Sequence, residues 1–240
     1  VLLLSPSLSP SSPSASPPPP APDFPHASPA RDAQFYPRYA AGDGVVALFA
    51  TCSADTPLQL WDAGRGTVRA AYAPRNALDE LDAPFCLAFA PPDGADIFCG
   101  CTAGVVREID ISRPGTSSRV VTAKSALGSS SSSTIISCLD CDALGTSGLL
   151  AAGTFSGTLA LLDPRAPPRA ALVHADRRTP DFCSGIAAVR FADRSGRALL
   201  AAGRGSDGVL EFDVRSLGAA VRRLPGRGAG EGAVAGRVGF

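Results

Sequence analysis

One arrangement of apolar and polar positions occurs four times along the chain. Each copy has an apolar run that ends in small residues, then a tight turn, then a second apolar run that closes on an aspartate. The first runs are LFATCS (48–53), IFCGCT (97–102), LLAAGT (149–154) and LLAAGR (199–204). Short apolar runs bounded by turn residues are typical of β-strands, so each copy predicts a β-hairpin.

The closing aspartates give the period of this repeat. They lie 48, 53 and 50 residues apart, at Asp62, Asp110, Asp163 and Asp213. Repeats of about 40–45 residues are typical of the four-stranded blades of WD-type propellers, and the extra residues fit in loops. The sequence therefore predicts an all-β fold, a WD-repeat β-propeller with four recognisable blades.

The expected strands follow the repeat. Blade one has Phe35-Tyr36-Pro37 as the remnant of its first strand, then residues 45–50, 58–61 and 67–72. The other three blades use residues 85–90, 96–101, 105–111 and 119–123; 135–141, 149–154, 158–163 and 170–174; and 186–191, 198–203, 209–214 and 220–224. Many of these strands are apolar on both faces, which predicts sheets covered on both sides, as stacked blades are.

Three segments are expected. Residues 1–34 are mostly Pro, Ser and Ala and are predicted to be a disordered tail. Residues 35–225 form the blades. Residues 226–240 are a glycine-rich link followed by the start of a further blade. Methionine is absent, even at position 1, which favours a piece of a larger ring.

The net charge, the lengths of the apolar runs and the cysteine positions limit the classes of function open to the chain. The formal net charge is zero, so the whole chain has no general attraction to nucleic acid or membrane. No apolar run reaches the roughly 20 residues that a membrane span needs. The seven cysteines follow the strands rather than a disulfide framework, and we expect reduced thiols in an intracellular compartment.

The cysteine pairs and the glycine-rich segment could suggest a metal, redox or phosphate site, but a structural role explains them better. Side chains at Cys138 and Cys141 face opposite ways on a strand, and no histidine pair completes a metal site with Cys99 and Cys101. The glycine-rich segment 226–236 lacks the Lys-Ser/Thr of a phosphate loop. We therefore predict no enzyme activity, no metal and no cofactor.

Several polar residues have places typical of WD repeats. Ser53, Asp55 and Trp61 occupy the strand, the turn and the following strand of a hydrogen-bonded set, in which the indole N–H needs a buried partner. His174 ends the last strand of a blade, where such repeats often have a structural histidine. Structural roles are expected for these residues and for the four closing aspartates.

Arg204 is the strongest candidate for ligand binding. It ends an apolar strand beside the turn 205–208, at the rim where propellers bind ligands. Its guanidinium can stack on an unpaired base or pair with phosphate. Arg177 and Arg178, in the preceding inter-blade loop, could add phosphate contacts. The alternative is that Arg204 bridges to Asp207 across the turn and has no ligand.

Several short motifs together point to one family. In chain order they are PLQLWD (57–62), GTVRAAY (66–72), NALDEL (76–81), IFCG (97–100), RPG (113–115), IIS (135–137) and the pair Gly203-Arg204. From about residue 35 to residue 215 the chain resembles the telomerase Cajal body proteins, a WD-repeat family. "Asp-Glu-Leu" between two blades and "Arg-Pro-Gly" after a third strand are not general features of WD repeats.

That resemblance implies a seven-bladed, non-catalytic scaffold. It implies binding to small Cajal body RNA or telomerase RNA and the proteins of those particles, in the nucleus, at Cajal bodies. Other proteins would bind through the propeller faces, with no membrane and no DNA contact. The alternative function is a general WD-repeat platform for protein–protein interaction without RNA, which the fold and the zero net charge also fit.

Overall fold

The computed structural model describes residues 23–38, 47–115, 118–122, 134–142, 147–167, 171–174, 180–192 and 195–226. Within these ranges nearly all regular structure is β-strand, with two short 3₁₀ turns, η1 (Thr102–Gly104) and η3 (Pro180–Phe182). The predicted all-β class is confirmed. None of the helical turns in these ranges is long and apolar enough to span a membrane.

The strands form four antiparallel sheets of four strands, each in simple chain order. Blade 1 has β1 (Ala30–Phe35), β2 (Leu48–Ser53), β3 (Leu58–Asp62) and β4 (Thr67–Tyr72). Blade 2 has β5 (Cys86–Phe89), β6 (Asp96–Gly100), β7 (Val106–Asp110) and β8 (Arg119–Thr122). Blade 3 has β9 (Ile136–Cys141), β10 (Leu150–Thr154), β11 (Leu159–Leu162) and β12 (Ala171–His174). Blade 4 has β13 (Ile186–Phe191), β14 (Ala198–Gly203), β15 (Gly208–Asp213) and β16 (Arg222–Pro225).

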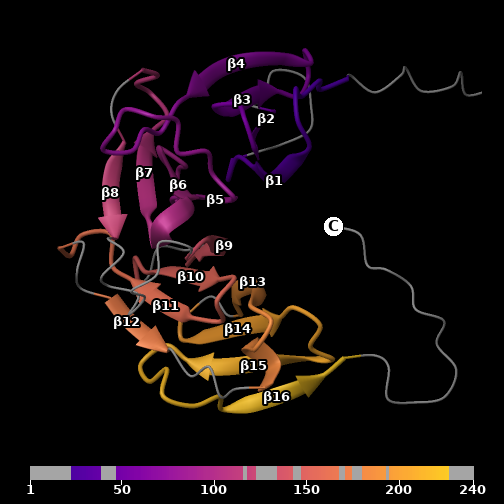
Figure 1. The fold of residues 1–240 in the computed structure, drawn as a ribbon, viewed down its shortest axis with the longest axis vertical. Coiled ribbons are helices and arrows are strands. Elements are labelled where there is room, and N and C mark those ends of the chain that lie inside the picture. Colours follow the sequence, from indigo (N-terminus) through magenta and orange to yellow (C-terminus); the bar gives the residue numbers. More distant parts are fainter. Residues whose placement is uncertain are drawn as a thin grey trace, which may run out of the picture.

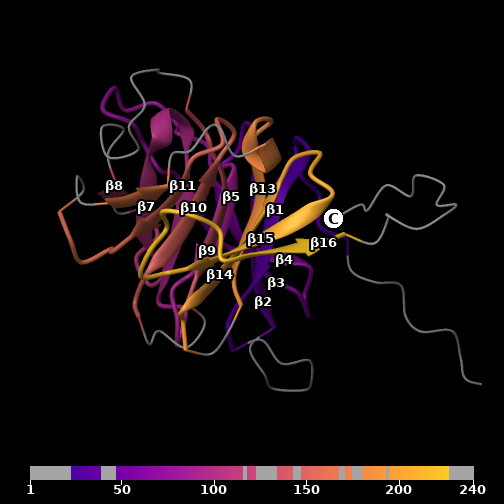
Figure 2. The ribbon, with the colours of Figure 1, turned by 90° about the horizontal axis from the view of Figure 1, so that it is seen from below.

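The four sheets fan out along an arc, with β1, β5, β9 and β13 innermost and β4, β8, β12 and β16 outermost (Figure 1). Figure 2 shows η1 and η3 at the same end of the sheets. We call this end the upper rim; it carries the β2–β3, β6–β7, β10–β11 and β14–β15 turns. The opposite end, with the β3–β4, β7–β8, β11–β12 and β15–β16 connections, is the lower rim. This arrangement is that of a β-propeller, as predicted.

The hydrophobic core lies between neighbouring blades rather than inside one sheet. One cluster of buried side chains, including Leu58, joins blades 1 and 2. A second joins blades 2 and 3 and includes Phe98 and Leu150, and a third joins blades 3 and 4 and includes Leu161 and Phe212. Because each side chain of this kind contributes about 1.5–3 kcal/mol when fully buried, stacking of the blades stabilises the fold.

The small residues that end the second strand of each blade have a packing role. A Cβ added at Gly100 would lie 2.5 Å from Cγ2 of Ile136 in the next blade. A Cβ added at Gly153 would lie 2.7 Å from Cγ2 of Ile186, again in the next blade. Glycine at these places lets the isoleucine of the following inner strand pack against the sheet, which explains the recurring small-residue step in the sequence.

The start of the propeller lies earlier than the sequence indicated. The boundary predicted at residue 35 falls at the end of β1, because the strand comprises Ala30–Phe35. Arg31, Asp32 and Gln34 line a cavity, so this strand needs no apolar run and its polar sequence ARDAQF gave no hydrophobic signal. Residues 1–22 and 227–240, for which a tail and the start of a further blade were predicted, lie outside the described residues.

Candidate functional site

The four closing aspartates begin turns at the lower rim. Oδ1 of Asp62 accepts hydrogen bonds from the N–H groups of Gly64 and Arg65, both at 3.0 Å. The other three aspartates accept the N–H two residues later: Asp110 from Ser112 at 2.8 Å, Asp163 from Arg165 at 3.0 Å and Asp213 from Arg215 at 2.9 Å. Such aspartate-initiated turns fix the direction of the chain between strands.

These hydrogen bonds favour the charged form of the carboxylates. The pKa of Asp62 is lowered, chiefly by the N–H of Arg65. The pKa of Asp110 is lowered by the hydroxyl and N–H of Ser112. The pKa of Asp163 is lowered, first by the side chain and then by the N–H of Arg165. A carboxylate accepts such hydrogen bonds better in its charged form than in its neutral form.

Trp61 belongs to a hydrogen-bonded set centred on Thr51. The indole Nε1–H donates to Oγ1 of Thr51 at 2.9 Å, and Nε2 of His26 lies 2.7 Å from the same oxygen. The Ser53 hydroxyl instead bonds that of Thr56, and within the described ranges the exposed Asp55 carboxylate makes no hydrogen bond. These hydrogen-bond partners differ from the set expected from the sequence. The sequence did not indicate His26 as a partner, because residues 1–34 were assigned to the tail.

The segment before β1 packs against the same indole. The ring of Phe24 meets that of Trp61 edge-on, with their centroids 5.6 Å apart.

In blade 3, the expected structural histidine His174 is the last residue of β12 and lies opposite Leu159 of β11.

Inner strands are joined by hydrogen bonds from a side chain of one blade to the backbone of the next. Three such bonds are Leu87 N–H to Asp32 Oδ2 at 2.8 Å, Ser137 Oγ–H to the Ile186 carbonyl at 2.6 Å, and Phe191 N–H to Asp140 Oδ2 at 2.7 Å. Burial raises the pKa of Asp140, although the Phe191 N–H and Arg190 favour its charged form. These bonds hold the inner strands in register around the axis.

The upper rim contains a buried polar cluster that the sequence did not reveal. Asp82, in the connection from β4 to β5, accepts hydrogen bonds from Arg107 Nε at 3.1 Å and from the Thr102 hydroxyl at 2.9 Å. A related cluster in blade 4 has Asp181, whose Oδ1 accepts from the Ser206 hydroxyl at 2.5 Å. An aspartate just before an inner strand, together with a hydroxyl residue after the second strand, was the available signal.

Arg204 lies on the upper rim, immediately after β14. Its guanidinium carbon is 5.1 Å from the centroid of the Phe155 ring, which belongs to the β10–β11 turn of blade 3. Its N–H donates to the Gly185 carbonyl at 2.8 Å. Asp207 pairs with Arg223 instead, so the alternative bridge between Arg204 and Asp207 is contradicted. Arg177 and Arg178 lie outside the described residues.

A second arginine stacks in the same way at the start of β1. The Arg31 guanidinium carbon lies 3.8 Å from the centroid of the Phe85 ring, and its Nη1 donates to the Pro84 carbonyl at 3.2 Å. Phe85 in turn meets Phe155 edge-to-face, with centroids 6.2 Å apart and planes at 86°. Arg31, Phe85, Phe155 and Arg204 therefore form one row across all four blades, which we call the rim array.

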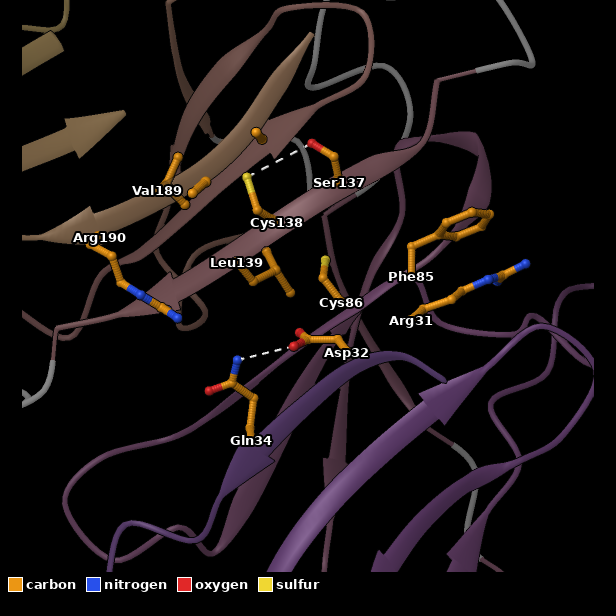
Figure 3. Close-up of a pocket in the computed structure, with 12 residues that line it drawn as sticks. Arg31, Asp32, Gln34, Phe85, Cys86, Ser137, Cys138, Leu139, Val189 and Arg190 are labelled. Carbon is orange, nitrogen blue, oxygen red and sulfur yellow. Dashed lines mark hydrogen bonds between the residues drawn. The ribbon is translucent and has the colours of Figure 1, made fainter. Parts of the chain in front are cut away.

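The rim array adjoins a cavity on the propeller axis. This cavity, of about 240 Å³, is lined by side chains from β1, β9 and β13 and by Phe85 and Cys86. Figure 3 shows Arg31 beside Phe85 at one side and Arg190 at the other, with Cys86 between them. A second cavity of about 300 Å³ continues toward the lower rim and shares Gln34 and Arg190 with the first.

The thiols beside this cavity are poor nucleophiles. Burial raises the pKa of Cys138 to about 11, and that of Cys86 well above its usual value. Burial also raises the pKa of Cys52 to about 12. All seven cysteines are free, and in the described part of the chain no group of three His, Cys, Asp or Glu side chains could hold a metal ion.

A comparison with curated proteins found relatives that all have the same name. The chain is 38% identical over 112 residues to the telomerase Cajal body protein 1 of Rattus norvegicus, covering 47% of this chain and 20% of the rat protein. It is similar to telomerase Cajal body protein 1. The mouse protein is 44% identical over 66 residues, 28% of this chain and 12% of the relative, and the human protein is 42% identical over the same length and shares. No family model matches the chain.

Solved structures support the fold alone. Chains in "COPII on membranes, outer coat vertex" and "The structure of the COPII coat assembled on membranes" both superpose with a TM-score of 0.60 at 16% sequence identity. Each covers 85% of this chain, and the shares of the two solved chains are 51% and 28%. The similarity to telomerase Cajal body protein 1 therefore rests on sequence, and these structures add only the propeller architecture.

Proposed function

We propose that this chain is part of a non-catalytic WD-repeat scaffold that binds small Cajal body RNA or telomerase RNA particles. Its place of action would be the nucleus, where it directs these particles to Cajal bodies. The sequence similarity to telomerase Cajal body protein 1 supports this assignment. The relative spans far more residues than the alignment, so the proposal concerns a protein of which these blades form a part.

The structural observation that carries the proposal is Arg204 on the upper rim. Its side chain is exposed, stacks over Phe155 and has no carboxylate within 4 Å in the described ranges. An arginine held against an aromatic ring presents a flat, positively charged face to solvent. Single-stranded RNA is recognised by stacking and by hydrogen bonds to base edges, which suit such a face.

Zero net charge limits how this scaffold could hold RNA. Without a strongly basic surface, affinity must come from a few placed contacts, and protein components of the particle would share the RNA. Arg177 and Arg178 precede blade 4 in the sequence and are proposed to add phosphate contacts. The propeller faces would bind the other proteins.

Crosslinking in cells tests this function. The tagged protein that contains these blades would be crosslinked to RNA, purified and its bound RNA sequenced, while microscopy compares its position with that of Cajal bodies. We expect enrichment of small Cajal body or telomerase RNA, and weaker enrichment with Arg204→Ala. The control is Arg215→Ala, which removes an exposed arginine at the lower rim of the same blade.

Two outcomes would contradict the RNA-binding function, and a third would contradict the part given to Arg204. Messenger RNA recovered at random would exclude a selective RNA role. Protein partners that persist after ribonuclease treatment, with no RNA enriched, would favour the protein–protein platform. Equal loss of enrichment with Arg204→Ala and Arg215→Ala would show that Arg204 has no special part.

A further inference from the structure

We infer that the rim array is a stacking surface for unpaired nucleobases, with one base held at each arginine–phenylalanine pair. This inference rests on the proposed RNA-binding function and names the contacts that would serve it. The array crosses the upper rim from Arg31 in blade 1 to Arg204 in blade 4, beside the axial cavity. A single strand would follow the rim across the blades.

The geometry of the array is that of two linked pairs. Arg31 covers Phe85 at 3.8 Å, and Arg204 covers Phe155 at 5.1 Å. The edge-to-face contact between the two rings joins the pairs. Because each member belongs to a different blade, the packing of the blades sets the spacing, and the surface is formed before any ligand binds.

The chemistry of the array favours a base over a cationic peptide. Each phenylalanine already has a guanidinium of the protein beside its ring. The positive charge of that guanidinium would repel a lysine or arginine side chain from a partner. The outer face of a stacked guanidinium is itself planar, and bases stack on arginine as well as on aromatic rings. Phe155 is 38% exposed, which leaves part of its ring available as well.

Other arginines near the upper rim are occupied by carboxylates. Arg223 is paired with both Asp181 and Asp207, and the buried Arg107 is paired with Asp82. Within the described ranges neither Arg31 nor Arg204 has such a partner within 4 Å. The charge available for phosphate is therefore small, and stacking supplies most of the affinity that we expect at this surface.

A binding experiment with two probes tests the inference. The full chain would be titrated against a fluorescein-labelled uridine octamer and against an abasic ribose-phosphate strand of equal length. In the double variant Phe85→Leu/Phe155→Leu, the Kd for the octamer should rise at least about fivefold, because base–aromatic stacking is lost. The Kd for the abasic strand should not change. Phe35→Leu, which alters an exposed phenylalanine of β1 outside the array, should leave both Kd values as in the wild type.

The salt dependence gives a second readout. A single strand loses affinity with a slope of about −0.7 per phosphate neutralised in a plot of log Kobs against log salt concentration. The two guanidiniums of the array and the proposed phosphate contacts of Arg177 and Arg178 together predict a slope no steeper than about −3. A steeper slope, equal losses for both probes, or an unchanged octamer Kd in the double variant would overturn the inference.

If the phenylalanine double variant does not fold, variants of the arginines test the inference instead. Thermal unfolding is measured for each variant, and if the double variant melts early, Arg204→Gln is compared with Arg215→Gln. Selective weakening of octamer binding in Arg204→Gln supports the array, and equal binding overturns it. The cell experiment remains separate: selective RNA recovery with a failed stacking test would retain the proposed function, whereas octamer stacking with random RNA recovery would retain only the array.

Discussion

Asp82 and Arg107 form a buried ion pair, with Oδ2 of the carboxylate 3.1 Å from Nε of the guanidinium. Their side chains are 5% and 9% exposed. Asp82 lies in the connection between blades 1 and 2, and Arg107 lies in β7 of blade 2. The pair therefore fixes the connection that leads from the first blade into the second.

Asp82→Ala should destabilise the fold strongly. Removing one member of a buried pair leaves the other charge unpaired, at a cost of about 3–5 kcal/mol. Urea unfolding measures this change in the free energy of unfolding. Asp79→Asn is the control, because it removes a highly exposed carboxylate from the same connection and asparagine tolerates the positive φ of this residue. A difference below about 0.5 kcal/mol between the two variants would contradict a structural role for the buried pair.

Gly153→Ala should also destabilise the protein. The new Cβ would lie 2.6 Å from Sγ of Cys138 and 2.7 Å from Cγ2 of Ile186, so blades 3 and 4 must shift. Overpacking of this kind costs about 1–3 kcal/mol. In the control Gly64→Ala, the nearest contact is 3.4 Å, to the Asp62 carboxylate. Thermal unfolding that ranks the two variants equally would contradict the inter-blade explanation.

The carboxylates that hold the lower-rim turns should contribute to acid sensitivity. The pKa of Asp163 is lowered in the folded protein, so its stabilising effect is present above the unfolded carboxyl pKa of about 3.9 and is lost as pH falls through the folded pKa. Asp163→Asn keeps an acceptor for the Arg165 N–H but removes the charge. The wild type should therefore be the more stable at neutral pH, by no more than about 1 kcal/mol because the pair is exposed.

Unfolding curves of wild type and Asp163→Asn from pH 7 to pH 2 check this expectation. The difference in stability should shrink as pH falls below about 4. Asp55→Asn is the matched control for loss of one surface carboxylate, at the opposite rim. A difference that grows toward acid pH would show that the sign of the Asp163 effect is the reverse of the one inferred.

Cys183 should be the first thiol to react in the native protein. It is exposed, whereas the other six thiols are buried. Burial and neighbouring groups raise the pKa of five of these six, which keeps them protonated at neutral pH. Mass spectrometry after brief iodoacetamide treatment at pH 7.5 should find Cys183 modified, and the rest modified only after unfolding. Early modification of Cys138 would indicate that the axial cavity opens in solution.

The repeating elements of the fold could be predicted from the sequence because each has a local signal. The small-residue step, the tight turn and the closing aspartate recur in all four blades, and they correspond to glycine packing and aspartate turns. The strand β1 had no such signal. Its polar residues face the axial cavity, so the strand forms from its pairing with β2 rather than from a hydrophobic pattern.

The candidate site was predictable only in part. Arg204 could be chosen from its place after an apolar strand, but its contact with Phe155 depends on how blades 3 and 4 pack. Arg31 was assigned to the tail, and Phe85 was placed in a strand, so nothing in the local sequence joined them. Contacts between residues about 50 positions apart require the angle between blades, which short motifs do not specify.

The hydrogen bonds between inner strands have a consequence for how this sequence can diverge. Asp32, Ser137 and Asp140 supply the side chains, while Leu87, Ile186 and Phe191 take part only through backbone N–H or carbonyl groups. A substitution at a backbone partner keeps the bond, whereas a substitution at a side-chain partner removes it. Each of these bonds therefore requires a particular residue type in only one of the two adjoining blades. The sequence of the other blade can change at that position without a compensating change in its neighbour.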